Sequence, residues 1–345
     1  MSSHKSSQFK SLLGWLPGLV ISLVAVLIII QLVNWADLGS SLRKFTPFYI
    51  AASVTLTLLF LGVRSIAWRS LLGGRAKISQ TFWVINQGYL LNNLLPFRAG
   101  EVGRAILLGQ STGLGTAHVL SSIIIERAFD LIIAAMLLLT TLPLALGMAW
   151  ARSAAVITLL FVSILILFLF MIANRQERVK KLVATVSTHW DWVHRKITPQ
   201  INSLLNGLEA LSNPRQFFIS IFWLLLSWVI AVTQYFVLLL ALDSSAKFWW
   251  GMFTDGVLAL GIAIPSAPAS LGTFEAAIVG ALSVLKIDQT AALAYGVTVH
   301  FLQFLLTGIL AVIGLTLQGQ SLKKFILRFS SKDTKTDIVE TQLQE

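Results

Sequence analysis

Long apolar stretches restrict what this chain can fold into more than any other feature of the sequence. The first, Leu13–Val33, runs for 21 residues without a charged side chain. As an α-helix it would be about 32 Å long at 1.5 Å per residue, which matches the thickness of a bilayer core. Five further stretches are as long, and we therefore expect six transmembrane helices in all: Leu13–Val33, Pro47–Leu72, Thr116–Gly147, Ser153–Ala173, Phe217–Leu242 and Gln289–Leu317.

The composition agrees with a membrane protein and excludes several other classes. Hydrophobic residues make up 56% of the 345 residues and charged residues only 12%, with a mean hydropathy of +0.80. Because a soluble domain carries roughly 25% charged residues, a soluble enzyme, a disordered chain and a fibrous repeat are excluded. The chain has no cysteine, which rules out disulfides, thiolate metal sites and covalently attached haem.

Two apolar regions, Thr81–Gly109 and Gly251–Lys286, are interrupted midway by proline and glycine. Such breaks free backbone N–H and C=O groups, which is tolerable at membrane depth only where protein or a wet cavity satisfies them. We expect each region to form two half-helices that enter the membrane and return to the side they left.

The net charge is +11. The basic residues that cause it are distributed as membrane topology predicts, so the charge gives no reason to expect nucleic acid as a partner. With the two broken regions returning to their own sides, 17 Lys and Arg fall on one side of the membrane, 5 on the other and 4 within it. The more basic side is normally cytoplasmic. We therefore expect a multi-pass protein of the cell membrane with both termini in the cytoplasm. The arginines within the membrane are Arg64, Arg98, Arg104 and Arg127.

The two broken regions also indicate an internal repeat. Pro96 and Gly100 in the first recur as Pro268 and Gly272 in the second, both 172 residues later. The same shift places the flanking apolar stretches of the first region on those of the second. Because the two hairpins would enter from opposite faces, the repeat is inverted, as in many transporters.

The expected fold is therefore an all-α polytopic membrane protein with six transmembrane helices and two re-entrant broken-helix hairpins. We assign residues 1–320 to one transmembrane domain, with repeat 1 at about 47–147 and repeat 2 at about 217–317. Residues 174–216 show apolar residues at helical spacing with basic residues between them, and we expect an amphipathic cytoplasmic connection there. Residues 321–345 would form a cytoplasmic tail.

Ionisable residues concentrate around the first break and on the helix after it. Each costs on the order of 2.5 to 3.5 kcal/mol at membrane depth, so each needs a partner or water. The cluster is electrically neutral, and two interpretations stay open. Structural ion pairs could lock the hairpin to the next helix, or one or two arginines could exchange a carboxylate for a ligand phosphate. Its members are Arg98, Glu101, Arg104, Glu126, Arg127 and Asp130.

Further candidates lie at the starts of the second half-helices. Helices that begin near Gly100 and Gly272 would direct free N–H groups and positive dipole ends at the breaks, where they favour an anion. Asn92 and Asn93 could donate to a headgroup or cap the broken backbone. Glu275 could be a helix cap or, if transport is coupled to protons, a proton carrier, and Glu101 is a second candidate for carrying protons. His300 could be a hydrogen-bonded core histidine or a proton relay, and Asp255 has the same two interpretations.

Several chemistries have no matching motif. The sequence contains no Gly-x-x-x-x-Gly-Lys loop, no His-Glu-x-x-His pair and no Gly-x-Ser-x-Gly elbow. We therefore expect no ATP-driven mechanism in this chain, and neither a metal nor another cofactor.

These residues together resemble a known family. Asn93-Leu94-Leu95-Pro96 precedes Arg98, Gly100, Glu101 and Arg104, and Glu126-Arg127, Asp130, Pro265, Pro268, Gly272 and Glu275 follow. The pattern is similar to the transmembrane region of lysylphosphatidylglycerol synthases, also called flippase-like integral membrane proteins, over roughly residues 10–320. The second block departs from the family pattern, with Ala267 and Ala269–Leu271 where more glycine is expected.

The resemblance implies a function in lipid movement. Full-length synthases of the family carry a soluble aminoacyl-transferase domain that makes the lipid, while the membrane part moves it between leaflets. Only 28 residues follow Leu317 here, so the resemblance implies a stand-alone bacterial or archaeal protein that translocates a polar, phosphate-bearing lipid and is not an enzyme. The partner would be a membrane phospholipid or a lipid-linked substrate.

Two alternatives stay open at this point. The chain could be a secondary transporter of a small organic anion, or a non-catalytic membrane partner of a glycosyltransferase. In the leading hypothesis Arg98, Arg104 and Arg127 hold the phosphate, and Glu101, Glu126 and Asp130 orient or release them.

Overall fold

The computed structural model of the chain describes residues 20–95, 99–148, 213–263 and 266–330, together with scattered positions between 153 and 185. In these ranges every regular element is a helix. Four helices are long and apolar enough to cross a membrane, or five if a bent N-terminal pair counts as one span. Arg98, most of Ser153–Ala173, most of the connection 174–216 and the tail after Ser330 lie outside the described residues.

The four long helices follow the apolar stretches closely. They are α3 (Pro47–Leu71), α6 (Thr116–Ala145), α10 (Pro214–Leu242) and α13 (Gln289–Leu317). Proline occupies the first turn of α3 and α10, where its missing N–H costs nothing. Asp288 caps α13, since its side chain accepts hydrogen bonds from the backbone N–H groups of Thr290 and Ala291. The predicted boundaries of these four helices are confirmed to within three residues.

The described part of the first apolar stretch is a helix that turns sharply. Val20–Leu32 is followed by α2 (Trp35–Leu42) at an angle of 92°. Asn34 makes the corner, because its side-chain oxygen caps α2 and its backbone N–H donates to Thr290 Oγ1 at 3.1 Å. The chain therefore leaves the expected span direction after Leu32 and lies against the start of α13.

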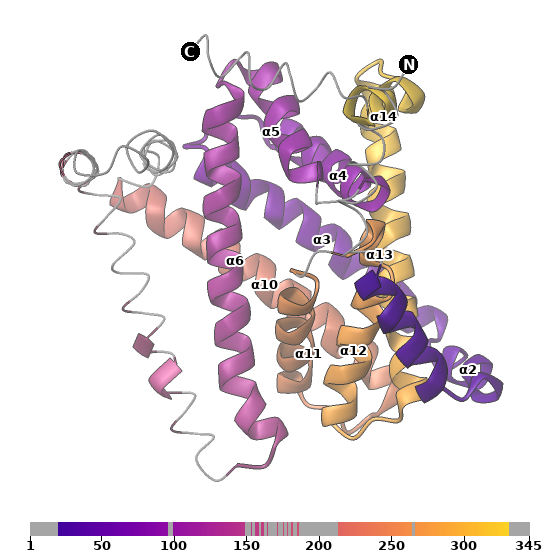
Figure 1. The fold of residues 1–345 in the computed structure, drawn as a ribbon. Coiled ribbons are helices and arrows are strands. Elements are labelled where there is room, and N and C mark those ends of the chain that lie inside the picture. Colours follow the sequence, from indigo (N-terminus) through magenta and orange to yellow (C-terminus); the bar gives the residue numbers. More distant parts are fainter. Residues whose placement is uncertain are drawn as a thin grey trace.

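Both interrupted regions are broken into two helices, as predicted. The first consists of α4 (Ile78–Leu94) and α5 (Ala99–Thr112), and the second of α11 (Phe248–Gly261), the short 3-10 turn η3 (Pro268–Ser270) and α12 (Thr273–Val284). Figure 1 shows α4 and α5 beside the upper end of α6 and α11 and α12 beside its lower end. The breaks of the two pairs therefore meet near the middle of the molecule.

Glycine brings α4 and α5 together. A Cβ atom on Gly100 would lie 1.9 Å from the carbonyl oxygen of Gly88, and one on Gly103 would lie 2.3 Å from Leu91 Cδ1. The two backbones are therefore in direct contact along one face, which no larger side chain permits.

Apolar packing joins the broken pairs to the long helices. One buried cluster centres on α11, α12 and α13, and another on α3, α4, α5 and α6. Large apolar side chains also cover the outside, among them Phe48 at 73% exposure and Leu317 at 69%. An apolar exterior of this kind fits lipid rather than water as the surrounding solvent, and the chain is a multi-pass integral membrane protein.

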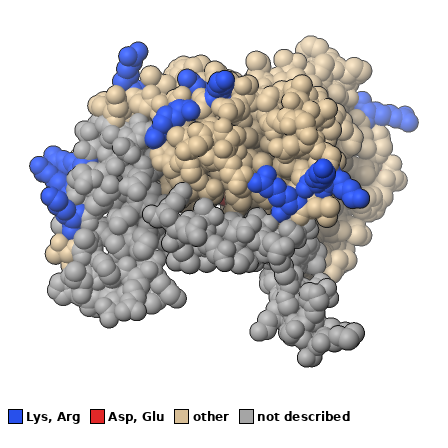
Figure 2. Space-filling model, turned by 90° about the horizontal axis from the view of Figure 1, so that it is seen from above, with Lys and Arg blue, Asp and Glu red and all other residues tan. Residues whose placement is uncertain are grey.

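The two ends of the molecule differ in charge. Figure 2 shows lysine and arginine side chains spread over the face that is uppermost in Figure 1. Among the described residues, the exposed basic side chains at the end that carries the start of α4 and α14 (Leu322–Ser330) are Arg75, Lys77, Arg215, Lys323, Lys324 and Arg328. The loops at the other end hold Arg43, Lys44, Lys247 and Lys286 together with the acidic residues Asp37, Asp243 and Asp288.

Candidate functional site

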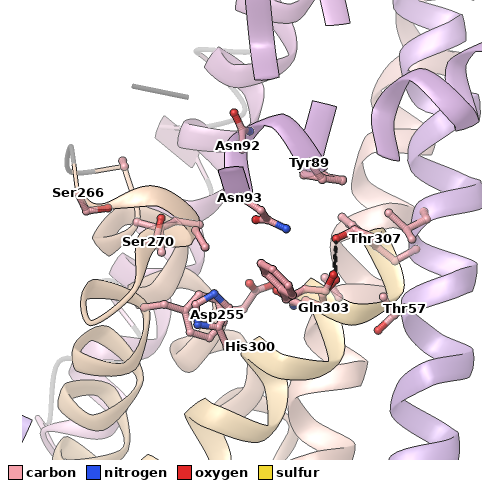
Figure 3. A pocket seen from close by; sticks show the side chains of 18 of the residues that line it. Thr57, Tyr89, Asn92, Asn93, Asp255, Ser266, Ser270, His300, Gln303 and Thr307 are labelled. Carbon is pink, nitrogen blue, oxygen red and sulfur yellow. Dashed lines mark hydrogen bonds between the residues drawn. The ribbon is translucent and has the colours of Figure 1, made fainter. Parts of the chain in front are cut away.

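A cavity of about 460 Å³ lies between the two breaks. Its wall is built from α3, α4, α5, α6, α10, α11, α12 and α13 together with the segment that joins α11 to α12. Figure 3 shows hydroxyl, amide, carboxyl and imidazole side chains arranged around it. Broken helices in a membrane protein need partners for the backbone groups that the break frees. A cavity with polar side chains between the two breaks can provide such partners.

The end of α4 forms the wall on the side of the first break. Tyr89, Asn92 and Asn93 all line the cavity. Asn92 also satisfies the broken backbone, since its Oδ1 accepts a hydrogen bond of 2.8 Å from the N–H of Gly100. Of the two roles expected for these asparagines, Asn92 performs the backbone role, and Asn93 extends into the cavity (Figure 3).

The segment between α11 and α12 forms the wall on the side of the second break. Ala269 and Ser270 line the cavity with φ angles of 57° and 56°, a left-handed conformation that costs a non-glycine residue of order 1–3 kcal/mol. The alanines and serine that replace the expected glycines therefore do not prevent the tight turn, but they store strain at the cavity wall. Gly272 follows with φ 82° and packs against Ser22 of the N-terminal helix.

Glu275 links the start of α12 to the cavity. Its Oε2 accepts a hydrogen bond of 2.8 Å from the N–H of Gly272, so Glu275 caps the helix, as one of the two interpretations predicts. Its Oε1 lies 2.6 Å from His300 Nδ1. The imidazole of His300 lines the cavity and stacks on Phe274 with ring centroids 4.2 Å apart. The carboxylate of Glu275 therefore has two partners, the backbone N–H of Gly272 and the titratable imidazole of His300.

A buried ion-pair cluster lies beside the cavity. Its centre is Arg64 on α3, whose Nε donates to Glu126 Oε1 at 2.7 Å and whose Nη1 donates to Asp130 Oδ1 at 2.8 Å. The second Nη also pairs with Asp130. The side chains of Arg64 and Glu126 are 4% and 1% exposed. Trp228 of α10 adds an indole N–H at 3.0 Å to Asp130, so the cluster ties α3, α6 and α10 together.

Arg104 belongs to the interior of this cluster. Its Nη2 lies 2.8 Å from Glu126 Oε2 and its guanidinium lies 4.1 Å from the ring centroid of Trp68. Its side chain is only 5% exposed, and it is not among the described residues that line the cavity. The ion-pair interpretation therefore fits Arg104 and Glu126 better than direct contact with a ligand.

Arg127 is the arginine of the described cluster that reaches the cavity. It lines the wall with Glu101, and the two side chains are 31% and 27% exposed with Nε and Oε1 4.0 Å apart. Arg127 Nη2 lies 3.1 Å from Asp130, three residues later on the same helix. Since Glu126 and Asp130 both have Arg64 as a further partner, Arg127 is free to share its guanidinium with a ligand.

From the sequence alone Arg64 received no role, although a lone arginine in an apolar span must have an acidic partner, and that argument would have found it. Asp255, for which the sequence left a core role or a proton-relay role open as for His300, lies on α11 and lines the cavity together with His300 and Gln303 (Figure 3). Gly100 serves the contact between α4 and α5 rather than the cavity wall. Arg98 lies outside the described residues.

Comparison with known proteins identifies relatives. A family model described as the lysylphosphatidylglycerol synthase transmembrane region matches residues 15–311. A UPF0104 membrane protein of Methanocaldococcus jannaschii is 28% identical over 212 residues, 59% of this chain and 83% of the relative. A UPF0104 membrane protein of Methanothermobacter thermautotrophicus is 25% identical over 354 residues, 93% of this chain and 99% of the relative. No solved structure matches the chain.

Proposed function

This chain belongs to the family of the lysylphosphatidylglycerol synthase transmembrane region, and from this premise we propose that it moves a polar, phosphate-bearing lipid between the two leaflets of the cell membrane. The headgroup passes through the cavity between the two breaks while the acyl chains stay in lipid. The partner of the protein is then a membrane phospholipid or a lipid-linked substrate, and the protein acts without chemical change to its cargo.

One observation carries the proposal, namely the partly exposed guanidinium of Arg127 in the wall of a cavity. The other polar side chains of this wall are neutral amides and hydroxyls, His300 and carboxyl groups, and apolar side chains such as Phe60 and Phe304 lie between them. A guanidinium binds a phosphate through two parallel hydrogen bonds. Asn93, Gln303 and Ser270 line the same cavity and can donate further hydrogen bonds. An apolar exterior next to this polar interior suits a molecule with one charged and one apolar end.

The arrangement of the helices supports an inverted repeat as the transport unit. Shifted by 172 residues, α5 would cover 271–284, and α12 is Thr273–Val284. The two pairs lie at opposite ends of α6 (Figure 1), as two hairpins that enter from opposite faces would. The basic residues around α14 and at the start of α4 support a cytoplasmic location for that end and for both termini.

To test the proposal, the purified full chain is placed in vesicles that contain a fluorescent phospholipid. Dithionite added outside reduces the label in the outer leaflet, so the fraction of label lost measures the exchange between the leaflets. Wild type should speed exchange of a phosphate-bearing lipid over empty vesicles. Arg127→Gln should slow it about 10- to 100-fold, since a charge-assisted pair is worth roughly 1.5–3 kcal/mol. Folding should persist because Glu126 and Asp130 keep Arg64.

Arg43→Gln is the matched control, since Arg43 is exposed at the end of α2 and distant from the cavity lining. Exchange by Arg127→Gln at the wild-type rate would remove Arg127 from the transport path. Uptake of a small organic anion into sealed vesicles without any lipid exchange would favour the secondary transporter instead. A requirement for an added glycosyltransferase would favour the partner hypothesis.

A further inference from the structure

Asp255 differs from the other acidic residues around the cavity in having no partner among the residues that the structure describes. It lies on α11, is 7% exposed and lines the cavity. Its Oδ2 is buried without a hydrogen-bond partner among the described residues. None of the ion pairs in the described part of the chain involves it. Figure 3 shows it among the side chains that line the cavity, together with His300.

The neighbouring charges of the cavity are already matched. Arg127 pairs with Asp130 at 3.1 Å, and Glu275 lies 2.6 Å from His300. A change in the protonation of Asp255 therefore changes the net charge of the cavity without first breaking an ion pair. The charged and titratable groups on the helices around α11 are His118, Glu126, Arg127 and Asp130 on α6, Arg215 and Tyr235 on α10, Glu275 on α12, and Tyr295 and His300 on α13.

Burial without a counter-ion decides which form of Asp255 the cavity holds. An ionised carboxylate is strongly disfavoured away from water unless a positive group or several donors surround it. A metal cation would need several oxygen ligands, and the described residues contain no group of three or more His, Asp or Glu that could hold one. The neutral, protonated carboxyl group is the form that fits.

The position of Asp255 is fixed by close backbone contacts on two sides of α11. A Cβ atom on Gly256 would lie 3.1 Å from Leu138 N on α6, and one on Gly251 would lie 2.8 Å from Val232 O on α10. Because α11 is held in place, Asp255 exchanges its proton through the cavity rather than by swinging out of the protein.

We propose that Asp255 is the proton-binding site that couples proton movement to the passage of the anionic headgroup, an inference that rests on the proposed function. An ionised carboxylate and a phosphate in one cavity repel each other, so phosphate binding favours protonation of Asp255 and protonation favours phosphate binding to the same degree. A lipid with one negative charge then crosses together with one proton. The proton leaves when the headgroup leaves and water enters the cavity.

The experiment uses the full chain in sealed phosphatidylcholine vesicles with fluorescent phosphatidylglycerol added to the outer leaflet. Leaflet exchange and internal pH are followed in parallel samples, the latter with a trapped pH-sensitive dye. Exchange by wild type should fall about tenfold from mildly acidic to mildly alkaline pH, and inward lipid movement should acidify the interior. Asp255→Asn should exchange lipid without this pH dependence and without acidification, whereas Asp37→Asn, exposed on α2, should behave as wild type.

Each contrary result has a distinct meaning. Wild-type exchange that is independent of pH and causes no acidification overturns the inference while leaving lipid movement intact, whether or not Asp255→Asn folds. Acidification that persists in Asp255→Asn, or exchange that depends on sodium and not on pH, overturns it as well. Absence of any exchange by wild type removes the proposed function and the inference with it.

Discussion

The two broken-helix pairs differ in how completely their charges are matched. Beside α4 and α5, Arg64, Arg104 and Arg127 share Glu126 and Asp130 in a buried cluster that leaves only Arg127 partly exposed. Beside α11 and α12 the charges are few: Glu275 pairs with His300, and Asp255 has no partner among the described residues. In the first region the ion pairs join neighbouring helices. In the second region the carboxyl group of Asp255 can bind or release a proton without breaking an ion pair of the described residues.

The backbones of the two pairs also differ. α4 and α5 touch through Gly88 and Gly100, while the segment before α12 holds Ala269 and Ser270 at positive φ angles. Because α11 is held by close backbone contacts to α6 and α10, whereas Ala269 and Ser270 store strain, we expect any movement in the segment before α12 rather than in α11 or in the pair α4 and α5.

The strongest test of this comparison replaces one ionisable residue in each region. Arg64→Met leaves buried carboxylates with fewer counter-ions, and the free energy of unfolding should drop by about 3–5 kcal/mol. Asp255→Asn replaces a buried carboxyl group that has no partner among the described residues by a neutral amide of similar size, and should leave stability unchanged or higher. Thermal unfolding in detergent, followed by tryptophan fluorescence, measures both, and equal losses would contradict the difference between the regions.

A second test compares glycines in the two pairs. Gly100→Ala forces a Cβ atom into the carbonyl of Gly88 and should cost about 1–3 kcal/mol or more, because two backbones must separate. Gly280→Ala on α12 meets no atom within 4 Å and should stabilise its helix by up to about 1 kcal/mol. The same unfolding measurement applies, and a Gly100→Ala protein as stable as wild type would show that the contact is adjustable.

The smallest expected effect concerns the cap of α12. Glu275→Ala removes the acceptor for the N–H of Gly272 and should cost about 1 kcal/mol, whereas Glu275→Gln keeps an acceptor and should cost less. Unfolding of the two variants side by side separates the cap from the contact with His300. If both lose the same stability, the contact with His300 rather than the cap holds the start of α12.

The length of the apolar stretches was sufficient to predict the long helices from the sequence. Pro47, Pro214 and Asp288 are start signals that act within a few residues, so α3, α10 and α13 begin at or close to the places where the apolar stretches begin. The corner at Asn34 was not predicted, because it depends on a hydrogen bond to Thr290, 256 residues away.

The candidate site was only partly predictable for the same reason. Arg127 and Asp130 are three residues apart on one helix, and spacing alone brings them together. The partners of Arg104 and Arg64 lie on another helix, so their burial follows from packing that no local pattern encodes. For Asp255 the sequence leaves a core role and a proton-relay role open, because the feature that distinguishes it, the lack of a partner among the described residues, depends on packing.

The attachment of the second break to the N-terminal helix has a consequence for biosynthesis. Ser22 Oγ accepts a hydrogen bond of 2.9 Å from the N–H of Ala267, a contact that spans 245 residues of chain. Because Ser22 is synthesised well before Ala267, the helix that contains Ser22 cannot make this contact until the segment around Ala267 has been inserted. A chain whose synthesis stops before Ala267 would therefore leave the helix that contains Ser22 without the neighbours that it has in the finished protein.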